Sequence, residues 1–388
     1  MSELRFLTSG ESHGQALVTI LEGIPAGLEI SEDYIAADMH RRQGGYGRSR
    51  RQQLEVDRAQ ILAGVRHGRT LGSPIGMLIA NRVWEDWQDV MKVGEYDGDP
   101  KKVTRLRPGH ADLAGTMKFG LSDVRDVLER ASARETAARV AGGALAKAFL
   151  RALDVQVFSH VIQINAVRAP ARPDLQPEDF ADVDESPVRS LDPDASAAMV
   201  EEINRLRKAN ESLGGVFEVR AYGVVPGLGS HVSWEERLDG QLGGALLSIH
   251  AMKGVGIGEG FEMAGKPGSE VHDEIFWSEE RGYYRETNRA GGLEGGMTTG
   301  EPLILTAAMK PLPTLTKPLR SVDIATKEPA EALRERTDST TVPAAAVVGE
   351  AMVGLVLADA YRRKFGGDHI DDVLAAVRAY RERIDWRR

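Results

Sequence analysis

The amino-acid sequence predicts a single α/β or α+β body. Strand-like runs alternate regularly with helical segments along the whole chain, which is the pattern of a layered mixed fold. The length of 388 residues is enough for one large domain, or two medium ones, with a sizeable core. Because no clean linker interrupts the alternation, we expect residues 1–388 to form one domain, with 169–190 as a surface loop.

Composition narrows the class of protein. Hydrophobic residues make up 42% of the chain and charged residues 28%, which is typical of a soluble protein. The net charge of −9 argues against a nucleic-acid partner and against an acidic membrane. The lack of cysteine excludes disulfides, thiolate nucleophiles and zinc–thiolate or iron–sulfur sites. Residues 1–6 show no signal-peptide pattern, and no run approaches the roughly 20 apolar residues of a membrane span, so we expect a cytoplasmic enzyme.

Local signals predict the elements in order. The first helix is expected to begin at Ser31, with acidic residues in its first turn, and to end at Gly44 after a cationic last turn. A pair of strands is expected at 154–167, followed by a proline-rich, acidic surface loop at 169–187. Other strands are expected at 16–21, 54–57, 74–80, 215–225 and 302–309. Other helices are expected at 195–209, from Ser233 towards His250, from Pro343 to Phe365, and at 369–384.

The stretch from Arg130 to Ala146 is the centre of the predicted site. Ser132 followed by Glu135 is a capping-box pattern, which predicts that an alanine-rich helix begins at Ser132. A helix start offers free N–H groups and a partial positive charge to an anion. Arg130 and Arg134 lie on either side, and guanidinium forks match phosphate and carboxylate. Taken alone, an ordinary capped surface helix explains this stretch better.

Two histidines lie in short loops close to arginine. His13 lies in the segment Gly-Glu-Ser-His-Gly, and His110 follows a Pro-Gly turn three positions after Arg107. Loop histidines beside cations indicate acid–base work on an anionic substrate. A metal site is the rival interpretation. The nine histidines show no His-x-x-x-His spacing, so we expect no metal.

Glycine-rich segments suggest further ligand contacts. Residues 41–51 interleave arginine with glycine, which brings backbone close to a ligand beside oxyanion-binding forks; a basic loop for nucleic acid is the disfavoured alternative. Residues 260–267 nearly match a P-loop, but Pro267 replaces the hydroxyl that would hold magnesium, and the glycines at 254–260 lack dinucleotide-binding spacing. The segment 291–300 is expected to place bare backbone against a flat ligand.

Two further segments carry charge next to predicted elements. Lys310 to Thr314 is a stiff cationic segment after the strand at 302–309. Arg336 and Asp338 lie just ahead of the helix that begins at Pro343, where a simple acidic cap is the alternative explanation for Asp338.

Together these motifs resemble the chorismate synthase family. The matching segments are Gly10-Glu-Ser-His-Gly14, Arg41 to Arg48, Arg107 to Asp112, Arg130 to Thr136, Glu294 to Thr298 and Arg336 to Asp338. Thr337 and Ser339 depart from the family's usual Arg-Ser-Asp-Pro, and Ser49-Arg50 departs from glycine-rich sequence. The resemblance implies a β-α-β sandwich of antiparallel sheets and helices with internal pseudo-symmetry, assembled as a homotetramer.

The resemblance also implies a reaction. It is an anti-1,4-elimination of phosphate from 5-enolpyruvylshikimate 3-phosphate, which gives chorismate and requires reduced FMN (FMNH2) without net redox change. The substrate carries a phosphate and two carboxylates, so binding requires several fixed cations. No region looks like a flavin reductase, so an external flavin reductant is expected, with NADPH only indirectly the source of reduced flavin.

Specific residues inherit roles from the resemblance. His13 would protonate or hydrogen-bond the departing phosphate, His110 would face the flavin and manage its proton, and Asp338 would assist proton removal near flavin N5. The expected substrate-binding residues are Arg42, Arg48, Arg51, Arg107, Ser132, Arg134 and Arg336. The expected flavin contacts are Arg130, Ala131, Ser132, His250, Ala251, Gly296, Lys310, Pro311, Leu312, Pro313, Thr314 and Arg336. Arg42 and Arg48 match family positions assigned to NADPH, but we expect them to contact substrate.

Two other classes of protein are weighed against this one. A flavin oxidoreductase acting on a phosphorylated acid would need a nicotinamide site, and the sequence has no dinucleotide fingerprint. A scaffold that binds FMN or another anion would explain the arginines but would leave the two loop histidines and Asp338 without a purpose.

Overall fold

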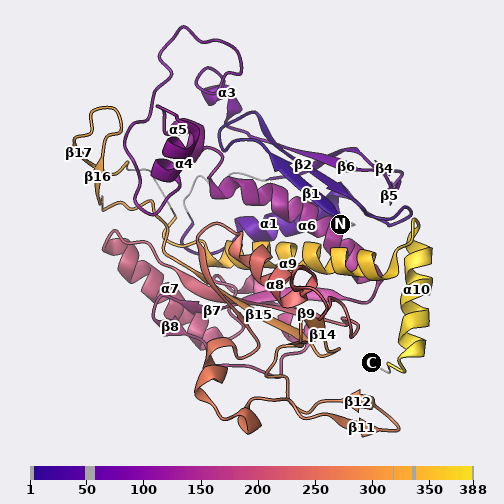
Figure 1. Ribbon diagram of the computed structural model, residues 1–388. Helices are drawn as coiled ribbons and strands as arrows, with labels where there is room; N and C mark the ends of the chain where they lie inside the picture. Colours follow the sequence, from indigo (N-terminus) through magenta and orange to yellow (C-terminus); the bar gives the residue numbers. More distant parts are fainter. Residues whose placement is uncertain (1–3, 49–56, 318, 334–337, 387–388) are drawn as a thin grey trace.

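Two antiparallel sheets enclose a layer of helices (Figure 1). The computed structural model describes residues 4–48, 57–317, 319–333 and 338–386. The first sheet has the strand order β1-β2-β6-β3. Its strands are β1 (Arg5–Ser9), β2 (Ala16–Glu22), β6 (Ile75–Ala80) and β3 (Gln60–Ala63). Alternation along β2 buries Leu17 and Leu21 while Ile20 stays exposed, so one face of this sheet joins the core.

The second sheet has the strand order β10-β15-β9-β7-β8. Its strands are β10 (Met252–Ile257), β15 (Leu303–Met309), β9 (Gly215–Tyr222), β7 (Gln156–Ile164) and β8 (Val167–Arg168). The β7–β8 hairpin confirms the paired strands predicted at 154–167. All the pairings in both sheets are antiparallel, as the α+β sandwich requires.

Two long helices form the centre of the molecule. Helix α6 (Thr136–Ala152) packs against β2, and helix α9 (Val342–Phe365) packs against β7 and β9 as well as against α6. Helices α1 (Glu32–Gln43) and α8 (Leu238–Leu247) lie beside them in the same layer (Figure 1). The expected sandwich of antiparallel sheets and helices is therefore confirmed.

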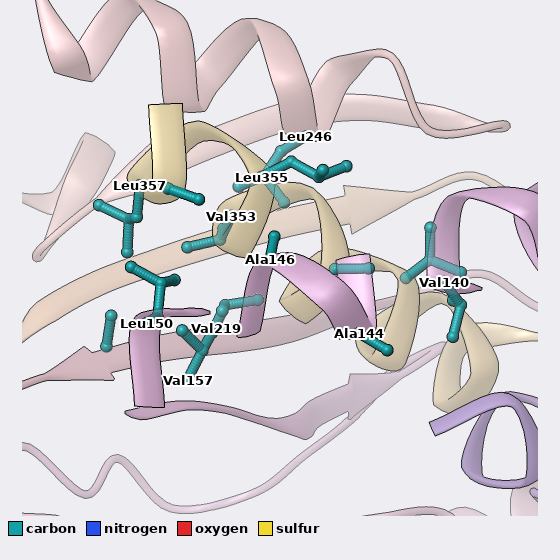
Figure 2. Packing of buried hydrophobic residues seen from close by; sticks show 14 of the residues in the cluster. Val140, Ala144, Ala146, Leu150, Val157, Val219, Leu246, Val353, Leu355 and Leu357 are labelled. Atoms are coloured by element: carbon teal, nitrogen blue, oxygen red, sulfur yellow. The ribbon is translucent and has the colours of Figure 1, made fainter. Parts of the chain in front are cut away.

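Small and branched apolar side chains fill the space between the two long helices and the second sheet (Figure 2). Each large side chain buried there contributes on the order of 1.5–3 kcal/mol to the free energy of folding. The labelled members of this core are Val140, Ala144, Ala146, Leu150, Val157, Val219, Leu246, Val353, Leu355 and Leu357. The core spans both sheets, so the chain forms one packed body.

The remaining elements surround this body. Its other helices are α3 (Trp84–Trp87), α4 (Asp112–Phe119), α5 (Arg125–Leu128), α7 (Pro193–Lys208) and α10 (Ile370–Arg383). The 3₁₀ helices are η1 (Ala133–Glu135), η2 (Pro177–Phe180), η3 (Val183–Glu185), η4 (Trp234–Glu236), η5 (Gly260–Gly265) and η6 (Gly268–Glu270). The short strands are β4 (Val65–Arg66), β5 (Arg69–Thr70), β11 (Phe276–Ser278), β12 (Gly282–Tyr284), β13 (Leu293–Glu294), β14 (Met297–Thr298), β16 (Arg320–Val322) and β17 (Pro329–Glu331).

Several predicted element ends are confirmed by their caps. Ser31 accepts a hydrogen bond from the Tyr34 backbone N–H at the start of α1, and Gly44 ends that helix.

Helix α9 is long and apolar enough to cross a membrane, but 83% of its most apolar window is buried, as in the core helix of a soluble protein. The strand predicted at 54–57 lies outside the described residues except for Asp57, which is not in a strand.

The structure changes one of the sequence-based predictions and adds detail to a second. The capping box at Ser132 forms only in part: its hydroxyl accepts the Arg134 N–H, but Glu135 binds Thr8 and Arg139 instead of turning back. A 3₁₀ turn therefore precedes α6, which begins at Thr136. The loop 169–190 contains η2 and η3 and buries Phe180, whose ring stacks on Phe158 at 5.0 Å, so it packs over the second sheet.

Close contact between α6 and α9 depends on Gly143. A Cβ atom on this residue would lie 2.3 Å from the Cβ of Ala351, and both positions belong to helix interiors that cannot easily move. We expect Gly143→Ala to lower the free energy of unfolding by roughly 1–3 kcal/mol, the usual cost of overpacking. Denaturant unfolding measures the change. Gly240→Ala in α8, where nothing lies within 4 Å of the added carbon, is the matched control and should be neutral or stabilising.

Candidate active site

One cavity of about 690 Å³ collects loops that are distant in the sequence. Its wall is made by the loop after β1, the end of α1, the loop before α4, the turn at Ser132, the α8–β10 turn, the segment after β15 and the start of α9. The predicted site residues that line it are His13, Arg42, Arg48, Arg107, His110, Ala131, Ser132, Arg134, His250, Ala251, Lys310, Leu312, Pro313, Thr314 and Asp338.

His13 is held by Glu129. Its Nδ1 lies 2.8 Å from Oε2 of Glu129, and its backbone N–H donates to the same oxygen at 3.0 Å. The Trp87 ring stacks on the imidazole with 4.0 Å between centroids. Burial raises the pKa of Glu129, but the hydrogen bonds from His13 and the charge of Arg125 outweigh it and leave that pKa lowered. An ionised Glu129 requires a proton on Nδ1, so Nε2 is the ring atom free for other partners.

His110 is held in the same way by Asp112. The Nδ1 atom lies 2.5 Å from Oδ1 of Asp112, a carboxylate with no exposed surface. Arg107 donates from Nε to the other carboxylate oxygen at 2.9 Å. Burial raises the pKa of Asp112, but hydrogen bonds from His110 and Arg107 prevail and lower it to about 2. The second imidazole is therefore also oriented through Nδ1.

Two arginines share one carboxylate in the cavity wall. Arg134 donates from Nη1 to Oδ2 of Asp57, and Arg42 Nη1 lies 3.4 Å from the same oxygen. Arg134 also donates twice to Oδ1 of Asn81, at 3.1 and 3.0 Å. Arg42 donates to the Thr136 hydroxyl at 2.9 Å, next to the start of α6. These contacts fix both guanidinium groups before any anion binds.

The remaining polar groups complete a mostly cationic wall. Arg48 Nε lies 3.6 Å from Oδ2 of Asp338, and both side chains are nearly buried. Lys310 donates to the Gly109 carbonyl, which ties the segment after β15 to the His110 loop. Burial first, and then the charge of Lys253, lower the pKa of Lys310. The wall thus presents several cations and two oriented imidazoles to one space.

His250 has an environment unlike those of the other two histidines. Its Nδ1 is buried and has no hydrogen-bond partner among the described residues. Burial is the largest cause that lowers its pKa to about 4, and Arg139 adds to it, while Glu135 opposes the shift. His250 is therefore neutral at pH 7.

The lowered pKa of His250 predicts a pH dependence of stability. In the unfolded chain, histidine protonates near its ordinary pKa of 6.5, whereas the folded state resists protonation down to about pH 4. Because the unfolded state binds more protons in that window, stability should fall as the pH drops from 6.5 towards 4. Melting temperatures across this window should decline less steeply for His250→Gln than for the unaltered chain. Equal slopes for the two proteins would contradict the expectation.

Some predicted site residues lie elsewhere. Arg130 donates to the carbonyls of Thr8 and Gly10, so it braces the His13 loop from outside the cavity wall. Pro311 is not part of the wall either. Gly296 lies between β13 and β14, where its carbonyl accepts the Leu238 backbone N–H and an added Cβ would lie 2.8 Å from Cγ of Arg237. Arg51 and Arg336 fall outside the described residues.

The glycines at 291–300 have a structural explanation within the chain. A Cβ on Gly291 would lie 2.3 Å from the Gly258 nitrogen, and one on Gly292 would lie 2.6 Å from the Pro302 carbonyl oxygen. Both residues have positive φ. Their lack of side chains therefore serves backbone packing at the edge of the second sheet, and the segment does not line this cavity.

Sequence reasoning missed the carboxylates behind the histidines. Asp112 lies two residues after His110 within a motif already singled out, so its spacing was a usable signal. Glu129, Asp57 and Asn81 carried no local signal, because each meets its partner only through the fold. In the described residues, no group of three or more His, Asp or Glu side chains is placed to hold a metal ion.

The cavity brings two carboxylate-held imidazoles and several arginines together, an arrangement typical of an enzyme that performs acid–base chemistry on a small anion. A family model described as chorismate synthase matches residues 4–361. The chain belongs to the chorismate synthase family. Its activity is accordingly that of a carbon–oxygen lyase, which forms chorismate in the last step of the shikimate pathway.

Individual relatives match along nearly the whole chain. The chorismate synthase of Desulforudis audaxviator is 55% identical over 383 residues and that of Symbiobacterium thermophilum 54% over 389, each covering 98% of this chain and 98% or more of the relative. The chorismate synthase of Thermus thermophilus is 52% identical over 384 residues. A crystal structure of chorismate synthase superposes with a TM-score of 0.80 at 41% identity and covers 98% of both chains.

Proposed function

We propose that the cavity around His13 and His110 is the place where phosphate is eliminated from 5-enolpyruvylshikimate 3-phosphate. The observation that carries this proposal is the convergence of two carboxylate-held imidazoles and five arginines on one cavity of about 690 Å³. That volume lies within the usual range for small-molecule and cofactor sites. The cations match a substrate with one phosphate and two carboxylates.

Reduced FMN fits the same cavity. One part of the wall is apolar and suits a flat ring, whereas the buried Nδ1 of His250 offers an unused hydrogen-bonding atom. The apolar lining residues include Leu128, Ile249, Met252, Leu312 and Val348. Lys310 and the turn at Ser132 would hold the polar parts of the cofactor. When bound, reduced flavin lends electron density to the substrate ring as the carbon–oxygen bond breaks and recovers it afterwards.

The two histidines, Asp338 and the arginines of the wall have different tasks in this proposal. His13 donates a proton or hydrogen bond from Nε2 to the departing phosphate, while Glu129 holds its other nitrogen. His110 would face the reduced flavin and hold its proton, and Asp338 would assist proton removal on the side of flavin N5. Arg42, Arg48, Arg107 and Arg134 position the substrate and stabilise the charge that builds on the leaving group. The same role is proposed from the sequence for Arg51 and Arg336, which lie outside the described residues.

The proposal assigns Arg42 and Arg48 to substrate rather than to NADPH. Both guanidinium groups are largely buried and are fixed by Asp57, Thr136 and Asp338 within the cavity wall. Reduced flavin would come from an external reductant in the cytoplasm, with NADPH only its indirect source.

Assembly as a homotetramer is part of the proposal. Large apolar side chains lie exposed on the outer face of the first sheet and around η4 and η5, which favours contacts between copies of the chain. Examples are Leu7, Leu62, Trp234 and Phe261, with 65%, 57%, 79% and 85% of their surface exposed.

Anaerobic incubation with 5-enolpyruvylshikimate 3-phosphate and dithionite-reduced FMN tests the function. Chorismate and free phosphate should appear in equal amounts while the flavin stays reduced after each turnover. Net oxidation of flavin in step with substrate consumption would instead support an oxidoreductase. Absence of both products would overturn the proposal.

A further inference from the structure

We propose that Glu129 and Asp112 are positioning residues that fix His13 and His110 in the tautomer protonated on Nδ1, so that Nε2 of each ring does the chemistry. This inference rests on the proposed function for the roles of the two histidines. The hydrogen bonds of Glu129 and Asp112 assign the tautomer of each histidine. They also assign Nε2 as the ring atom that reacts.

Glu129 holds His13 through more than the ring. Its backbone carbonyl accepts the Ser12 N–H at 3.0 Å, and its Oε2 accepts both the backbone N–H and the Nδ1–H of His13. Trp87 covers one face of the imidazole, and the Arg125 guanidinium lies 5.0 Å from the centroid of that indole ring. The ring can therefore neither rotate nor translate without breaking several of these contacts.

The His110 site repeats the same three parts. Asp112 accepts from His110 through Oδ1, and Arg107 donates to both carboxylate oxygens, at 2.9 Å from Nε and 3.1 Å from Nη2. Arg107 Nη2 also lies 3.2 Å from Nδ1 of His110, but the contact of Nδ1 with Oδ1 is much shorter at 2.5 Å, so we assign the Nδ1 proton to the carboxylate. The Arg107 backbone N–H donates to Oδ2 at 3.0 Å. Each histidine therefore belongs to an Arg–carboxylate–His set, Arg125–Glu129–His13 in one case and Arg107–Asp112–His110 in the other.

The arginine in each set balances the negative charge of the carboxylate behind the imidazole. An unpaired carboxylate behind each imidazole would repel a substrate that carries a phosphate and two carboxylates. Arg125 donates to Oε1 of Glu129 at 3.0 Å, and Arg107 likewise donates to Oδ2 of Asp112. The carboxylate can then orient the imidazole while the cavity stays cationic overall. The lowered pKa values of Glu129 and Asp112 agree with carboxylates that stay ionised.

Hydrogen-bond counting shows what an amide would do in place of Glu129. Arg125 and the His13 backbone N–H can only donate, so they compete for the single acceptor oxygen of glutamine. The His13 ring is the one partner that can change from donor to acceptor. Glu129→Gln should therefore move the His13 proton from Nδ1 to Nε2, and Asp112→Asn should do the same to His110.

A third histidine–carboxylate pair provides a matched control. His160 lies 3.1 Å from Glu218 through Nε2, beneath the loop 169–190, and neither residue lines the cavity. Glu218→Gln removes a carboxylate from a buried histidine in the same chain. It should leave kcat unchanged.

The test compares Glu129→Gln, Glu129→Asp, Asp112→Asn and Glu218→Gln in the full-length enzyme. The ¹⁵N shifts of the ring nitrogens, recorded without substrate, report the tautomers, and steady-state assays report kcat and KM. We expect Glu129→Gln and Asp112→Asn to switch tautomer and to lose at least tenfold in kcat with little change in KM, because a wrongly protonated ring cannot present its working atom. Glu129→Asp should keep the tautomer and recover part of kcat.

Two results would overturn the inference. One is a folded Glu129→Gln enzyme with the kcat of the unaltered chain; the other is a loss of kcat while the Nδ1–H tautomer persists. If Glu129→Gln does not fold, Asp112→Asn decides by the same readouts. The tautomers are measured on the resting enzyme, so persistence of the Nδ1–H tautomer in a folded Glu129→Gln protein counts against the inference whether or not the unaltered chain makes chorismate.

Discussion

Replacing either His13 or His110 with alanine should lower kcat by about 100-fold or more, the usual scale for a group that moves a proton in the transition state. Both rings line the same cavity, and each is oriented through Nδ1 by a buried carboxylate. The two histidines have separate tasks in the proposed reaction, so both single variants should be affected. Assays with chemically reduced FMN isolate this effect from the supply of reductant.

His231→Ala is the control for the two histidine variants. His231 is exposed and does not line the cavity, so its removal should leave kcat unchanged. Unfolding curves of all three variants exclude a general loss of structure, since removing an imidazole leaves Glu129 or Asp112 without one donor. Near-normal turnover in both His13→Ala and His110→Ala would remove the histidines from the mechanism.

The features predicted best from the sequence are those set by neighbours along the chain. Helix α1 begins after Ser31 and ends at Gly44 because a hydroxyl caps the first turn and glycine ends the last. Pro343 lies in the first turn of α9 as expected, since proline has no N–H to lose there. Such signals act within one turn of helix, so the sequence alone is enough to locate them.

Contacts between distant segments account for what was missed. Glu135 was expected to complete a local capping box, but it binds Thr8, which is 127 residues away in the chain, and Arg139. Glu129 reads as one more acidic residue before Arg130 until the fold brings His13 onto it. The motifs located the histidines and arginines of the site; only the three-dimensional structure shows which carboxylates orient them.

Glu350 illustrates the same limit in the core, and replacing it should have the largest effect on stability. The carboxylate has no exposed surface, yet it accepts from Arg41 at 2.7 Å, Lys147 at 2.9 Å and the Ser159 hydroxyl at 2.7 Å. Burial raises the pKa of Glu350, but Arg41 and Lys147 outweigh it and hold that pKa well below its ordinary value. Glu350→Gln would leave buried cations short of one charge. We expect a loss of roughly 3–5 kcal/mol in the free energy of unfolding, the scale for a broken buried pair.

The pH dependence separates this charge effect from simple loss of packing. A carboxylate with a lowered folded-state pKa stabilises the protein above its ordinary pKa of 4.5, and this contribution is lost as the pH falls below that value. The difference in stability between Glu350→Gln and the unaltered chain should therefore be full at pH 7 and shrink in acid. Denaturant unfolding of both proteins at pH 7 and in acid below pH 4.5 measures this difference in stability. Glu29→Gln, which removes an exposed partner of Arg69, should have a much smaller effect.

Replacing Glu350 should also affect substrate binding, because helix α1 connects Glu350 to the cavity wall. Arg41 binds Glu350, and the next residue, Arg42, enters the cavity wall beside Thr136 and Asp57. Because Arg41 also binds Asp38 and Asp184, α1 should stay helical in Glu350→Gln while its last turn loosens. A higher KM with nearly unchanged kcat, measured well below the melting temperature, would fit that picture. A variant as stable as the unaltered chain would show instead that these cations are balanced without Glu350.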